Sequence, residues 1–131
     1  MYLLDTNACI RILNGTSRAL AARLAREAPS DVSLCSVVKA ELLYGARRST
    51  HVAQNLQLLR RFFAPFISFA FDDAAAAHYG QIRADLASGG VPIGPNDLLI
   101  SAIARARDLV LVTHNTDEFG RVVGLQIEDW E

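Results

Sequence analysis

The stretch PIGPNDLLISAIARARDLVLVTHN at residues 92–115 predicts a buried helix followed directly by a buried strand. The predicted helix, Asp97 to Arg107, is apolar nearly all round, so it should lie between a sheet and another layer. Leu109–Thr113 is rich in β-branched and aliphatic residues and predicts the strand. A helix of this kind beside such a strand is typical of an α/β protein.

The rest of the chain continues the alternation of short apolar strands and amphipathic helices. Further strands are predicted at Tyr2–Leu4, Val32–Cys35, Ile67–Phe71 and, as an edge strand, Leu125–Ile127. Helices are predicted at Ala8–Leu13, Ser17–Glu27, Val37–Arg48 with Ser36 as its cap, His51–Phe63, and from Asp72 and Asp73 to Ala87. Helices that cross over both faces of a sheet predict an α/β sandwich with a mostly parallel sheet, whose site lies at the carboxyl ends of the strands.

Composition limits the class of protein. A chain of 131 residues, 51% of them hydrophobic, is expected to form one domain, residues 1–131. No apolar run reaches the length of a membrane span and no leader pattern is seen, so a cytoplasmic protein is expected. The net charge of −1 argues mildly against a protein held on nucleic acid by phosphate contacts alone. Cys9 and Cys35 fit neither a disulfide framework nor a zinc site.

Asp5 follows the apolar run Tyr2–Leu4 directly, so it is expected at the carboxyl end of a strand. Ligands bind at this edge of a parallel sheet, which makes Asp5 a candidate for chemistry. The alternative is that its carboxylate only caps the helix that begins near Asn7.

Two more acids are expected in positions where a lone carboxylate is costly. Glu41 shares a helix face with Val37 and Tyr44, so it should have a cation, a metal ion or a hydrogen-bonding partner; an ordinary salt bridge to an arginine is the alternative. Asp97 begins the buried helix after the tight entry at Gly94, and its alternative is a first-turn acid that complements the helix dipole.

The fold should bring Asp5 and Asp97 to the same edge of the sheet, where their repulsion needs a bound cation or raised pKa values. Oxygen ligands favour magnesium or manganese, whereas the three histidines show no zinc spacing. A hard divalent ion held by carboxylates indicates phosphodiester hydrolysis. The absence of a P-loop motif disfavours a nucleotide hydrolase of that class.

Four segments of the chain resemble a known family, the PIN-domain toxins called VapC: LLDTN at 3–7, SVVKAELLYGA at 36–46, PIGPNDLLISAIARARDLVLVTHNTDEFGRV at 92–122 and LQIEDW at 125–130. The resemblance covers essentially the whole chain. It implies a three-layer α/β/α sandwich and a Mg²⁺- or Mn²⁺-dependent endoribonuclease. It also implies a homodimer, a cognate VapB-type antitoxin and toxin-antitoxin hetero-oligomers. The implied substrate is structured RNA, commonly tRNA cut in the anticodon loop, and for this subgroup initiator tRNA.

The resemblance also assigns roles to residues. Asp5 and Asp97 would ligate the metal and Glu41 would complete the acidic pocket. The family often has a fourth acid where this chain has Asn115, so either Asn115 or Glu118 would take its place, and the number of metals is left open. Supporting contacts to the ligands or the substrate would come from small polar residues, for which helix capping is the alternative: Thr6, Asn7, Ser36 and Thr113.

Basic residues at the rim of the site would hold the RNA stem while a loop phosphate enters it, and the candidates are Lys39, Arg47 and Arg83. Two other functions compete with the nuclease. An aspartyl-phosphate enzyme would use Asp5 as its nucleophile, but such enzymes usually have a second acid where this chain has Asn7. A catalytically silent PIN-fold module would bind RNA or a partner without turnover.

Overall fold

The computed structural model describes residues 1–131 and contains one five-stranded sheet with the strand order β3-β2-β1-β4-β5. Every neighbouring pair of strands is parallel. All carboxyl ends therefore lie along one edge, with β1 at the centre. The strands are β1 (Tyr2–Leu4), β2 (Val32–Cys35), β3 (Ile67–Phe69), β4 (Val110–Val112) and β5 (Gln126–Glu128).

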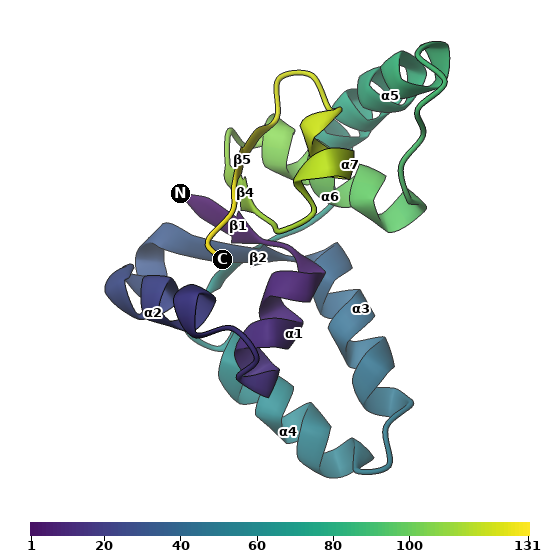
Figure 1. Ribbon diagram of the computed structural model, residues 1–131. Coiled ribbons are helices and arrows are strands. Elements are labelled where there is room, and N and C mark those ends of the chain that lie inside the picture. The colour runs from purple at the N-terminus through teal and green to yellow at the C-terminus, as the bar shows by residue number, and fades with distance from the viewer.

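Helices cover both faces of this sheet. They are α1 (Thr6–Asn14), α2 (Arg18–Arg26), α3 (Ser36–Arg47), α4 (Val52–Phe63), α5 (Asp73–Ser88), α6 (Pro95–Ala106) and α7 (Thr116–Gly120), with a 3-10 turn at Pro29–Asp31. Figure 1 shows α1 to α4 on one side of the strands and α5 to α7 on the other. The predicted three-layer α/β/α sandwich with a parallel sheet is confirmed.

The core has two parts. The larger surrounds the sheet and includes Leu3, Leu34 and Leu111, which are fully buried. The smaller lies between α5 and α6 and includes Ile82 and Leu98. Because α6 contributes side chains to both parts, it is buried between the sheet and α5, as its apolar sequence predicts. No helix combines the length and the apolar character needed to span a bilayer.

Several predicted boundaries are wrong. Ser36 does not cap α3: it is the first helical residue and is exposed, and Cys35 holds the cap position without a side-chain hydrogen bond. Helix α6 begins at Pro95 rather than Asp97, because proline is well suited to the first turn of a helix. Strand β3 ends at Phe69, before Asp72 caps α5. The prediction missed α7 and the 3-10 turn, which are too short to show a hydrophobic period.

Candidate active site

Asp5 lies at the end of the central strand β1 and is 4% exposed. Its Oδ1 accepts a hydrogen bond of 2.7 Å from the Ala8 amide, so the capping role considered for this residue is real. Burial raises the pKa of Asp5, hydrogen bonds from Thr113 and Ala8 lower it in part, and the charges of Glu131 and Glu41 raise it again. A buried carboxylate at the centre of the functional edge is thus both a helix cap and an energetically costly charge.

Glu41 reaches the same region from α3. The hydroxyl of Thr6, the first residue of α1, donates a hydrogen bond of 2.7 Å to its Oε1. Glu41 forms no ion pair, so the arginine partner considered for it is not found. This contact ties α3 to the residue that follows Asp5 in the sequence.

Asp97 is half-buried in the first turn of α6. Its pKa is raised to about 6, first by burial, then by a hydrogen bond with Glu118 and by the charges of Glu118, Glu41 and Asp5. Burial and the neighbouring acids both disfavour the charged form of Asp97. An ordinary first-turn acid would have no such neighbours.

The short helix α7 explains how Glu118 comes to this position. Asn115 caps α7: its Oδ1 accepts from the Glu118 amide at 3.4 Å, and its Nδ2 donates to Glu118 Oε2 at 3.0 Å. The Asn115 amide in turn donates to Thr113 Oγ1 at 3.0 Å. The side chain of Asn115 is occupied in holding Glu118, which after burial contributes most to the raised pKa of Asp97.

The other residues predicted for the site do not all lie near the acids. Asn7 and Ser36 are exposed, and neither side chain forms a hydrogen bond within the protein. Lys39 on α3 places its Nζ 5.0 Å from the centre of the Phe63 ring. Arg47 on α3 is exposed, and Arg83 lies over Tyr79 on α5, on the opposite side of the sheet. The three cations are therefore not brought together as one patch.

A second acidic group was not foreseen from the sequence. His114 Nδ1 lies 2.9 Å from Asp129 Oδ2 and 3.9 Å from Glu131 Oε2, while Arg11 Nη1 lies 2.8 Å from Glu131 Oε1. We call these four residues the C-terminal cluster. Ligand atoms of the histidine and both acids lie within 4.8 Å of one another, but the three residues are exposed and one of the acids, Glu131, is already paired with Arg11. Its members are separated by up to 120 residues, which hides the group from sequence inspection.

Asp5, Glu41, Asp97 and Glu118, which we call the edge acids, differ in having no cationic partner. No cation offsets the repulsion among these carboxylates, and this repulsion contributes to the raised pKa of Asp97. The donors are all oxygen, which suits Mg²⁺ or Mn²⁺. Unlike the C-terminal cluster, they supply no three ligand atoms within 4.8 Å of one another. That open arrangement fits an ion bound by one or two carboxylates with water completing its shell.

Comparison with known proteins agrees with this geometry. The family described as "PIN domain" matches residues 2–125. A tRNA(fMet)-specific endonuclease VapC of Shigella flexneri is 41% identical over 129 residues, 98% of this chain and 97% of that protein. The chain belongs to the VapC family of PIN-domain proteins.

Chains in solved toxin-antitoxin complexes have a fold similar to that of this VapC-family chain. DNA-bound VapBC from Salmonella typhimurium matches with a TM-score of 0.93 and 38% identity, covering 99% of this chain and 98% of that one. VapBC2 from Rickettsia felis, bound to a promoter DNA fragment, matches with a TM-score of 0.93, 34% identity and the same coverage. The VapC fold is thus shared over the whole described chain.

Proposed function

We propose that this protein, acting as one PIN domain over residues 1–131, is a metal-dependent endoribonuclease and the toxin of a VapBC pair. The observation that supports this most directly is the set of four edge acids without a cation at the carboxyl end of a VapC-family sheet. We propose structured RNA as the substrate, specifically the anticodon loop of initiator tRNA in the cytoplasm, since a relative of 41% identity is named a tRNA(fMet)-specific endonuclease.

Asp5 and Asp97 are the proposed ligands of Mg²⁺ or Mn²⁺, with Glu41 and Glu118 completing the acidic pocket. When bound, the ion supplies a water of lowered pKa and stabilises charge on the phosphoryl oxygens. The positive charge of a bound ion would also offset the repulsion among these carboxylates, which contributes to the raised pKa of Asp97.

The remaining residues of the site position these acids. Thr6 fixes one oxygen of Glu41, and Thr113 links Asp5 to the Asn115 amide. Asn115 holds Glu118 through two hydrogen bonds, so we assign to Glu118 the place of the fourth acid and to Asn115 a positioning role. Asn7 and Ser36 are exposed and lie next to Thr6 and Cys35 in the sequence. We propose that they contact the substrate.

A strongly acidic site repels RNA unless cations nearby offset it. Arg47 and Arg83 are exposed and form no ion pair, and Lys39 is two residues from Glu41 on α3. We propose that these three residues contact phosphates on either side of the site. A splayed loop can follow such a path more readily than a continuous helix.

The VapB-type antitoxin has a candidate docking place beside the acids. A groove of about 320 Å³ is lined by Glu41 and by side chains of α1, α3 and α4, including Ile10, Leu42 and Leu58. Ile10 and Leu58 are 40% and 46% exposed. We propose that an apolar antitoxin segment fills this groove and that its arginine reaches the edge acids, because a guanidinium matches carboxylate geometry and competes with the metal.

Incubation of the purified protein with total tRNA and with initiator tRNA tests the proposal, in Mg²⁺, in Mn²⁺ and in chelator, beside an Asp5→Asn variant. We expect metal-dependent cutting that the variant lacks. Metal binding without cutting of any tRNA would overturn the substrate assignment. If the folded protein binds no metal and cuts nothing, it is a silent binding module. Light scattering of the same sample tests the homodimer.

A further inference from the structure

A second cavity of about 320 Å³ lies between α5 and the first turn of α6. Pro95 and Leu98 form one wall, and they belong to the same helical turn as Asp97. The other walls come from α5 and from the loop before α6: Tyr79, Arg83, Leu86, Ala87, Pro92 and Ile93. Only one side chain of this cavity is charged. Asp97 does not line the cavity, but it precedes Leu98 in the chain, so RNA at Asp97 would lie within one helical turn of this apolar cavity.

Tyr79 and Arg83 give this cavity the chemistry of a base-binding site. The Tyr79 ring packs edge-on against Phe71 with centroids 6.0 Å apart, which fixes its orientation. The Arg83 guanidinium lies 5.9 Å from the centre of the Tyr79 ring, and its Nη1 donates to the Tyr79 hydroxyl at 2.8 Å. Arg83 has no carboxylate partner, so its charge is free for a polyanion.

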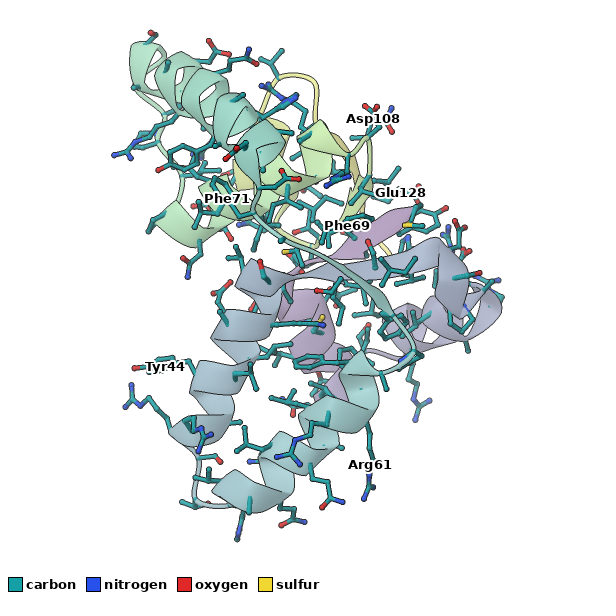
Figure 2. All side chains as sticks on the ribbon, turned by 180° about the vertical axis from the view of Figure 1, so that it is seen from behind. Tyr44, Arg61, Phe69, Phe71, Asp108 and Glu128 are labelled. Carbon is teal, nitrogen blue, oxygen red and sulfur yellow. The ribbon has the colours of Figure 1, made fainter.

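The molecule contains a second tyrosine–arginine pair with the same spacing, but without a cavity of this kind beside it. The segments Tyr44-Gly-Ala-Arg-Arg48 and Tyr79-Gly-Gln-Ile-Arg83 share the same spacing on a helix. Arg48 lies 5.7 Å from the Tyr44 ring centre and donates to its hydroxyl at 3.2 Å. Tyr44, however, is 62% exposed and projects from α3 away from the body of the protein, as Figure 2 shows. The difference between the two pairs is the cavity and its place next to Asp97.

We propose that the cavity beside Asp97 receives one unstacked base of the RNA next to the cleaved bond, with Arg83 holding the adjoining phosphate. This inference rests on the proposed nuclease function and adds a base subsite to it. Aromatic rings and arginine planes are the surfaces on which proteins stack single-stranded bases. The cavity lining has one cation and no acid, which suits a polyanionic ligand.

The test uses the full chain in chelator, which prevents cleavage, and a fluorescent RNA hairpin with a seven-nucleotide loop. Anisotropy gives the Kd for the intact hairpin and for hairpins with one abasic loop position each. For Tyr79→Ala we expect a Kd about tenfold higher with the intact loop, the size of one lost stacking contact. One abasic position should weaken the wild type by a similar factor and leave Tyr79→Ala unaffected. Tyr79→Phe should bind like the wild type.

Arg83→Gln should raise the Kd and lower the slope of log K against log salt by about one, as loss of one phosphate contact does. Tyr44→Ala and Arg48→Gln are the matched controls and should leave Kd within about twofold, as expected of surface side chains outside a site. Melting curves of all five variants check that the fold is intact.

Three results would overturn the base subsite. The first is RNA binding by Tyr79→Ala that is indistinguishable from that of Tyr44→Ala, and the second is persistence of every abasic penalty in Tyr79→Ala. A shift from dimer to monomer in Tyr79→Ala with unchanged RNA affinity would show that the cavity is an interface between copies. If the wild type neither binds nor cuts RNA, the proposed function fails as well. That outcome is distinguishable from the other three, in which the wild type still binds RNA.

Discussion

The edge acids and the C-terminal cluster both bring together carboxylates from distant parts of the chain, but they differ in how close the acids lie and in whether a cation pairs with them. In the C-terminal cluster the ligand atoms lie close together, but Arg11 is bound to Glu131 and His114 to Asp129. Among the edge acids the atoms are further apart, and each carboxylate is held by hydroxyl, amide or carboxyl groups rather than by a cation. If the edge acids hold the metal, as we propose, lack of a compensating cation marks the site better than closeness of the acids does.

The largest expected effect separates the two groups by activity. Asp97→Asn should lower kcat/KM for tRNA cleavage about 1000-fold, because it removes a proposed ligand of an ion that would stabilise the transition state by several kcal/mol. Asp129→Asn, the matched change in the C-terminal cluster, should change kcat/KM less than about threefold, since an exposed ion pair contributes little. Equal losses in the two variants would contradict the distinction.

A smaller effect is expected from the acid that α7 supplies. Glu118→Gln should lower cleavage about 10- to 100-fold, and Asn115→Ala should do so to a lesser extent, because groups that orient a metal site have effects of this order. Asp117→Asn is the control: Asp117 is the neighbouring acid, but it faces solvent and pairs with Arg121. Full activity in Glu118→Gln would remove Glu118 from the site.

The smallest expected effect is on stability. The folded protein holds the proton of Asp97 up to a pKa of about 6, whereas the unfolded chain releases it near 3.8. The native state therefore binds more protons between these values, and the free energy of unfolding must fall as pH rises through this window. In chelator the Tm should decline from pH 4 to pH 6, and Asp97→Asn should show a weaker decline. A Tm that rises over this window in chelator and does so equally in the variant would contradict the assignment.

The fold was largely predictable because it follows from local patterns. The apolar helix after Gly94 and the runs at Tyr2–Leu4 and Val32–Cys35 each specify an element whose burial the structure confirms. Parallel strands separated by helices leave few topologies, so the meeting of Asp5 and Asp97 at one edge could also be expected.

The details that escaped prediction depend on contacts between distant residues. Five residues of α7 show no period, although Asn115 followed three residues later by Glu118 is the spacing of a capping box and could have revealed it. The Thr6 to Glu41 bond spans 35 residues and the Arg11 to Glu131 bond spans 120. No sequence pattern shows which acid will meet a cation, and that is the property that distinguishes the two groups.

Calorimetric titration of Mn²⁺ into the metal-free protein tests the central claim most directly, with Asp97→Asn and His114→Ala as the paired variants. The edge acids predict binding to the wild type and to His114→Ala, and loss of that binding in Asp97→Asn. Binding that survives in Asp97→Asn and disappears in His114→Ala would place the metal in the C-terminal cluster and contradict the account.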